Sequence, residues 1–169
     1  MPDTTAPIEI RDADLSDRAA ANAIHKSAYP NDPYTYANNI GLRGTINLVA
    51  VKNNLTVGFI SVLINQPNPH GRFLWERMQP YIGYVGVSEE ARRSGIAKKL
   101  VIEASRRALH FTGKSHIYLE CENNNENAQK LYEKIGFEAI SPEEIEKAFG
   151  RPPHANSRVY RAEYQLFDS

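Results

Sequence analysis

The pattern of apolar and polar residues changes several times along the chain between a strand-like and a helix-like period. Residues 8–11 alternate apolar and polar side chains, and Asp14 then offers a helix N-cap with a second acid three residues on. Small and apolar residues follow at helical spacing until Pro30, where we expect the helix to end. Residues 31–45 mix turn-forming residues with tyrosines, which predicts a loop with a short helix.

Two apolar, β-branched segments at 47–52 and 57–64 flank an Asn-Asn turn and predict a hairpin. The elements predicted after it are a proline-rich connection with an aromatic cluster at 66–80, a strand at 81–87, a helix from 95 or 96 to 109, a strand at 116–121, a helix that ends at Gly136, a strand at 137–140, a helix at 142–149 opened by a capping box, and a strand at 158–167. This order predicts a mixed α/β layered domain with helices on both faces of one sheet.

Length and composition narrow the class of protein. A chain of 169 residues can form one domain with a sizeable core, so we expect residues 1–169 to be a single domain with a loose tail at 1–7. The formal net charge is zero, which argues against nucleic-acid and membrane partners. The single cysteine, Cys121, excludes an intrachain disulfide and any multi-cysteine zinc site. With no signal peptide or apolar membrane span in the sequence, we expect a cytoplasmic protein without a metal.

The junction between strand 81–87 and the following helix carries the pattern of an anion site. Small residues there let the backbone approach a ligand, the first N–H groups of the helix lack internal partners, and cations surround them. The same pattern also describes an ordinary solvated helix start, and neither a P-loop nor a dinucleotide fingerprint is present. The residues expected to bind a pyrophosphate are Arg92, Arg93, Ser94, Gly95, Ile96, Ala97 and Lys98.

Two motifs resemble those of the Gcn5-related N-acetyltransferase (GNAT) family. The loop Arg92-x-x-Gly95-x-Ala97 is similar to the family motif (Q/R)xxGx(G/A), with Ala97 where glycine is commoner. Residues 119–140 are similar to the second family signature, which here reads Asn125, Ala128, Leu131-Tyr132 and Gly136-Phe137. The resemblance is specific over residues 81–137. It implies a GNAT-like α/β (α+β) fold, with a central mixed, mostly antiparallel sheet of about six to seven strands and helices on both faces.

The resemblance also implies acetyl-CoA as cosubstrate and assigns residues to it. The loop from Arg92 would hold the pyrophosphate. Backbone N–H groups of Val85, Gly86 and Val87 would meet the pantetheine arm and the thioester carbonyl. Asn125 would hydrogen-bond the pantetheine arm, and it can at the same time be the N-cap of the following helix.

The catalytic residues that the resemblance implies each have a structural alternative. Tyr132 corresponds to the tyrosine that protonates the departing CoA thiolate, or it packs with the apolar stripe of its helix. Glu120 corresponds to a glutamate base that takes the amine proton directly or through water, or it is a solvent-facing strand residue. An ammonium such as that of lysine, whose ordinary pKa is about 10.4, must lose a proton before attack, so a base is needed.

The sequence therefore predicts an N-acetyltransferase that moves an acetyl group to a primary amine by direct attack in a ternary complex. The alternative is a catalytically silent acyl-CoA-binding GNAT module with a regulatory or interaction role. A protein N-terminus, a lysine, a polyamine and a small amine all remain open as acceptor, and a homodimer is one expectation because dimers are common in the family. The five histidines show no metal-ligand spacing and favour structural or surface roles. The segments 65–80 and 141–157 are the expected determinants of specificity.

Overall fold

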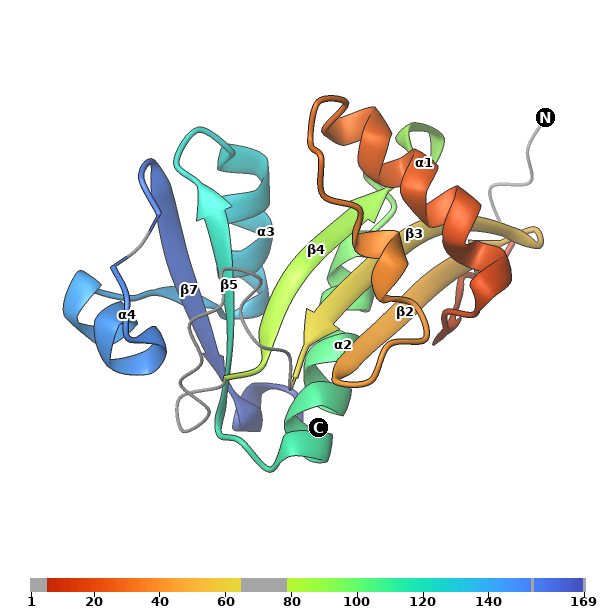
Figure 1. Cartoon of the computed structure of the whole chain (residues 1–169). Coiled ribbons are helices and arrows are strands. Elements are labelled where there is room, and N and C mark those ends of the chain that lie inside the picture. The colour runs from red at the N-terminus through yellow and green to blue at the C-terminus, as the bar shows by residue number, and fades with distance from the viewer. Residues whose placement is uncertain (1–5, 65–78, 153, 169) are drawn as a thin grey trace.

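The computed structural model describes residues 6–64, 79–152 and 154–168. Within them, a seven-stranded sheet has the order β1-β2-β3-β4-β5-β7-β6 (Figure 1). Its strands are β1 (Glu9–Asp12), β2 (Thr45–Lys52), β3 (Leu55–Leu63), β4 (Tyr81–Val87), β5 (His116–Glu122), β6 (Glu138–Ala139) and β7 (Ser157–Glu163). Neighbouring strands are antiparallel except for the parallel pair β4 and β5. The predicted mixed, mostly antiparallel sheet is confirmed.

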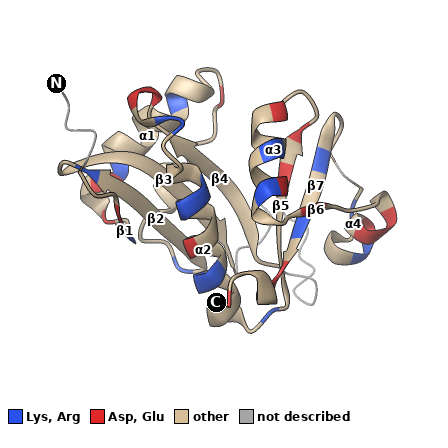
Figure 2. Ribbon diagram, turned by 180° about the vertical axis from the view of Figure 1, so that it is seen from behind, with Lys and Arg blue, Asp and Glu red and all other residues tan. Residues whose placement is uncertain are grey.

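Helices cover both faces of this sheet, as predicted (Figures 1 and 2). The helical elements are the α-helices α1 (Arg18–Ala28), α2 (Ile96–Thr112), α3 (Glu126–Ile135) and α4 (Pro142–Phe149), with the 3₁₀ turns η1 (Leu15–Asp17), η2 (Tyr36–Asn39), η4 (Glu89–Ala91) and η5 (Tyr164–Leu166). The main core lies between the sheet and α2 with α3, while α1 and η2 cover β2, β3 and β4 on the opposite face. On that second face α4 packs over β5 and β7 through Ile145, Tyr118 and Val159.

The parallel strands β4 and β5 stay paired at one end only. Pairing reaches Ile82 and Leu119 and then stops. At this point β4 has an extra residue, Gly83, relative to β3. Such a β-bulge bends its strand. The two strands therefore diverge, as Figure 1 shows, and residues 83–87 have no strand partner on their β5 side among the described residues.

Element boundaries differ from the predictions in places. Asp14 does form a capping box, but it caps the turn η1, so α1 begins only at Arg18. The predicted last strand 158–167 is too long, because the chain turns through η5 and buries Phe167 in the main core. The predicted connection 66–80 lies mostly outside the described residues.

Charged residues of both signs are spread over the molecule. Figure 2 shows Lys or Arg together with Asp or Glu on each of α2, α3 and α4. Among the described residues, no helix has the length and apolar character needed to span a bilayer.

Candidate active site

A pocket of about 240 Å³ lies where β4 and β5 diverge. Its walls come from four parts of the chain: α1 with the loop after it, β4, β5, and the start of α3. The residues that line it are His25, Tyr29, Asp32, Tyr36, Ile82, Gly83, Tyr84, Val85, Leu119, Glu120, Cys121, Glu122, Asn125, Ala128 and Tyr132. The bend in β4 thus creates the site, because parallel strands that stayed paired would leave no gap between them.

The loop before α2 has the geometry expected of an anion site. Gly95 is the N-cap of α2, its φ of 76° is left-handed, and no side chain caps the helix. A Cβ at Gly95 would have no atom within 4 Å, so the backbone is accessible there. Arg93 also has a positive φ, of 61°. These two left-handed residues turn the chain so that the first amides of α2 are free to bind a ligand.

Not every predicted loop residue can offer its side chain. Arg92, Arg93, Ser94 and Lys98 are exposed, whereas Ile96 is 1% exposed and belongs to the main core. Ile96 can contribute only its backbone amide.

Glycines on β4 make room for aromatic side chains. A Cβ at Gly83 would overlap the ring of Tyr36, and a Cβ at Gly86 would overlap the hydroxyl of Tyr84. Tyr36 and Tyr84 are stacked, with ring centroids 5.6 Å apart. Of the predicted binding residues Val85, Gly86 and Val87, only Val85 is among the described residues that line the pocket, next to this aromatic cluster.

Asn125 and Tyr132 lie together in the pocket wall. The Asn125 side-chain oxygen accepts a hydrogen bond from the Ala128 amide over 3.2 Å, so the N-cap interpretation is confirmed. Tyr132 is 8% exposed and packs against Phe137 and Tyr160. Burial raises the pKa of its phenol, which stays protonated at neutral pH and can donate. The packing role of Tyr132 is confirmed, and its role as a proton donor stays a prediction.

Glu120 is buried rather than facing solvent, with 7% of its side chain exposed. Its Oε2 accepts a hydrogen bond from Arg151 Nη2 over 3.1 Å, and its Oε1 accepts one from the His154 amide over 2.9 Å. The Tyr81 hydroxyl lies 3.5 Å from Oε2. The solvent-facing interpretation is therefore wrong. The role of Glu120 as base stays a prediction.

His25 and Asp32 are site residues that the sequence did not predict. His25 is 2% exposed, and its Nε2 lies 3.1 Å from Asp32 Oδ2. The Asp32 Oδ1 also accepts a hydrogen bond from the Tyr34 amide over 2.9 Å. The sequence gives little signal for this pair. His25 lies near the end of α1 and Asp32 in the loop after it, and only the fold brings them beside β4 and β5.

Cys121 also lines the pocket, and its sulfur lies near the carbonyl oxygens of Glu122 and Asn125. Burial raises the pKa of this thiol, which disfavours a thiolate nucleophile. Within the described ranges, no group of three or more His, Cys, Asp or Glu residues is arranged to hold a metal ion.

Comparisons with known proteins agree with this geometry. The model of the acetyltransferase (GNAT) family matches residues 14–137. The chain is 32% identical over 108 residues to N-alpha-acetyltransferase 30 of Schizosaccharomyces pombe, covering 64% of this chain and 67% of that protein. It is 43% identical over 60 residues to the chloroplastic GCN5-related N-acetyltransferase 4 of Arabidopsis thaliana, covering 36% of this chain and 20% of that protein.

A solved structure resembles the fold over nearly the whole chain. This is Arabidopsis thaliana NAA60 in complex with acetyl-CoA, with a TM-score of 0.70, 19% identity, and 94% of this chain and 99% of that chain covered. The family match extends over most of the chain, and it includes both the loop before α2 and the signature on α3. The protein therefore belongs to the GNAT family of acetyltransferases.

Proposed function

We propose that this acyltransferase moves an acetyl group from acetyl-CoA to a primary amine, with both substrates bound in the cleft between β4 and β5. The observation that supports it most is the pocket between β4 and β5 that contains Tyr132 and Asn125. The chain continues from β4, which forms one wall of this pocket, to the uncapped helix start at residues 92–98. The relatives named as N-acetyltransferases, and the similar structure with acetyl-CoA bound, support the same reaction.

The residues present fit acetyl-CoA. The uncapped start of α2 and its cations suit a pyrophosphate. The unpaired backbone edge of residues 83–87 offers hydrogen bonds of the kind an amide-containing pantetheine arm can use. Asn125 lines the same pocket. When bound, acetyl-CoA would supply a thioester that an amine can attack.

The protein's own groups would move the protons of this reaction. The acceptor ammonium loses a proton, the amine nitrogen bonds to the acetyl carbon, and the carbon–sulfur bond breaks. Because both oxygens of Glu120 already accept hydrogen bonds, we assign it to take the amine proton through an intervening water. The Tyr132 phenol would then donate its proton to the departing sulfur, and the second proton that the nitrogen releases on becoming an amide would restore the phenol.

Release of free CoA tests the proposal. Purified protein would be mixed with acetyl-CoA and a panel of primary amines and N-terminal peptides, and the acetylated product identified by mass spectrometry. Acceptor-dependent CoA release with matching product is the expected result. Tight acetyl-CoA binding without transfer to any acceptor would instead favour the catalytically silent module.

A further inference from the structure

The pocket brings together carboxylates from distant parts of the chain. Asp32 comes from the loop after α1, while Glu120 and Glu122 come from β5. None of the described residues that line the pocket is a lysine or an arginine. A cleft lined by one sign of charge attracts ligands of the opposite sign.

These carboxylates differ in how much of their charge is available. Glu120 is paired with Arg151 and is nearly buried. Asp32 contacts His25, and its side chain is 34% exposed. Glu122 is exposed, and no ion pair to it occurs among the residues described in the structure. The accessible negative charge therefore lies at Asp32 and Glu122.

Tyr29 lines the same pocket as these two carboxylates, and its carbonyl oxygen accepts a hydrogen bond from the Asp32 amide over 3.1 Å. It follows α1 directly and is 43% exposed. The pKa of its phenol is raised first by burial and then by the negative charges of Glu122, Cys121 and Asp32. Asp32 and Glu122 thus act on the same phenol from the two sides of the cleft. We call Tyr29, Asp32 and Glu122 the acidic rim.

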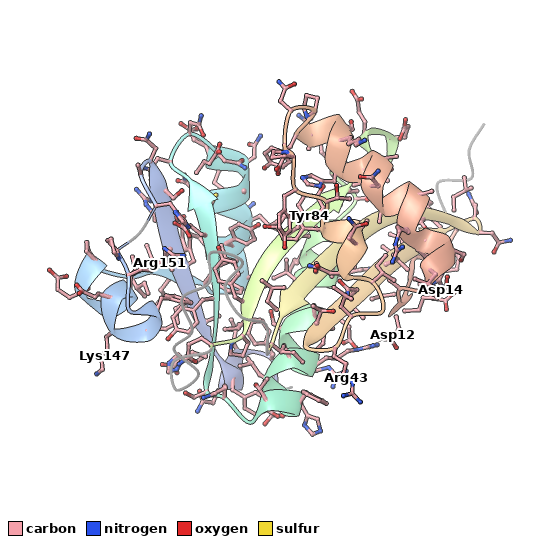
Figure 3. The ribbon with its side chains drawn as sticks, viewed as in Figure 1. Asp12, Asp14, Arg43, Tyr84, Lys147 and Arg151 are labelled. Carbon is pink, nitrogen blue, oxygen red and sulfur yellow. The ribbon has the colours of Figure 1, made fainter. Side chains whose placement is uncertain are left out.

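A second observation at the same pocket points to a ligand. Tyr84 is 7% exposed, and its hydroxyl is buried with no hydrogen-bond partner among the described residues. The ring is held by His25, with centroids 4.7 Å apart, and by Tyr36. Figure 3 shows Tyr84 beside the gap that separates β4 from β5. A buried hydroxyl without a partner costs free energy, which a polar ligand atom in this pocket would recover.

Positive charge gathers outside the pocket. The loop before α2, which is not part of the pocket lining, carries Arg92, Arg93, Lys98 and Lys99. Anionic groups are favoured there, whereas the acidic rim disfavours them. The two substrates therefore meet opposite electrostatic environments.

We propose that the acceptor is a polycationic amine, with a second positive charge close to the amine that reacts, and that Asp32, Glu122 and the ring of Tyr29 bind this second charge. The inference rests on the proposed acetyl transfer and narrows its acceptor class. Carboxylates bind an ammonium by charge-assisted hydrogen bonds, and an aromatic face adds a cation–π contact. An acceptor with a carboxylate at the same place would be repelled.

Three acceptors of equal chain length test the inference: 1,4-diaminobutane, butylamine and 4-aminobutanoate, which carry at the far end a cation, a methyl group and an anion. We expect kcat/KM to fall in that order, with at least about tenfold between the first and the last. The diamine's advantage over butylamine should exceed the statistical gain from its two equivalent amines, and it should shrink in high salt. Peptides whose reacting amine is followed by lysine or by glutamate form a parallel arm that distinguishes a protein acceptor from a free polyamine.

Isosteric variants locate the effect. Asp32→Asn and Glu122→Gln should each lower kcat/KM for the diamine by up to about fivefold, with little change for butylamine or in the KM for acetyl-CoA. Glu9→Gln, which removes the same charge from an exposed position on the edge strand β1 away from the pocket, is the control. Equal rates for the three acceptors, or an unchanged preference in the double variant, would overturn the inference while leaving acetyl transfer established. If no acceptor is acetylated, both the proposed acetyl transfer and the inferred acceptor class are wrong.

Discussion

Arg151 Nη2 donates a hydrogen bond to Oε2 of Glu120 over 3.1 Å, although the two residues are 31 positions apart in sequence. Glu120 belongs to β5 and to the pocket wall, and Arg151 lies just beyond the end of α4 (Figure 3). The His154 amide binds the other oxygen of the same carboxylate. One buried side chain thus fixes the connection between α4 and β7 beside the pocket.

The position of this connection should depend on the hydrogen bond between Arg151 and Glu120. Arg151→Gln removes the charge-assisted hydrogen bond, so the segment should lose its fixed position and the KM for the amine should rise by about tenfold. The KM for acetyl-CoA should stay nearly unchanged, because its expected contacts are on β4 and α2. Steady-state kinetics with each substrate varied in turn measures both constants. Lys147→Gln on α4 is the matched control. A change in the KM for acetyl-CoA alone would contradict the prediction, because it would place the segment beside the cofactor and not beside the amine.

The loop before α2 gives a second prediction. Gly95→Glu should abolish acetyl-CoA binding, because Gly95 is left-handed and a carboxylate there opposes an anion. Gly113→Glu is a close control, since Gly113 ends the same helix with a φ of 65° and an equally open Cβ position. Calorimetry should show binding to the Gly113 variant only. Unchanged affinity in the Gly95 variant would remove the loop from the cofactor site.

Tyr132→Phe separates chemistry from packing. The ring contacts with Phe137 and Tyr160 should survive, while the hydroxyl proton is lost. We expect normal acetyl-CoA affinity and a kcat lower by about 10²-fold, the lower end for general acid catalysis because a thiolate is a fair leaving group. A variant with wild-type turnover would leave Tyr132 with its packing role alone.

The buried carboxylate of Asp17 should make the free energy of unfolding depend on pH. It is 3% exposed and accepts hydrogen bonds from Arg11, Thr56 and the Asp14 amide. Burial raises its pKa, but these hydrogen bonds outweigh burial and the net shift is downward. A lowered carboxyl pKa adds stability above the unfolded value of about 3.8, and that stability is lost as the pH falls through the folded value.

Asp17→Asn should therefore lower the free energy of unfolding by about 2–3 kcal/mol at pH 7 and by less near pH 3. Urea denaturation at the two pH values measures the difference. Asp14→Asn is the control, because asparagine caps a helical turn about as well as aspartate and Asp14 is exposed. A loss of equal size at both pH values would show that the charge of Asp17 is unimportant.

Local signals predicted most of the elements correctly. Ser141 and Glu144 form the predicted capping box, and Gly113, Gly136 and Gly150 end their helices in left-handed conformations. Such signals work because capping and helix termination depend on a few adjacent residues. The last strand was predicted too long because the burial of Phe167 depends on tertiary packing, which alternation along one strand does not reveal.

Asn125, Ala128 and Tyr132 of the second motif line the pocket, and sequence alone pointed to them. The pocket residues that depend on distant contacts could not be found in this way. No acidic patch is evident along the chain, since Asp32 and Glu122 are 90 positions apart and become neighbours only across the cleft. Glu120 was expected either to act as a base or to face solvent. Its contact with Arg151 depends on where α4 places the following segment, which no local pattern specifies.

The bulge at Gly83 also makes the stability of the folded protein depend on ligand concentration. Backbone groups on β4 that a continuous sheet would pair remain open to a ligand. A ligand bound there would therefore contribute to the stability of the native state. A ligand at about one hundred times its Kd adds about 2.7 kcal/mol to the stability of the native state. With acetyl-CoA bound as proposed, the resistance of the purified protein to proteolysis should therefore rise with acetyl-CoA concentration.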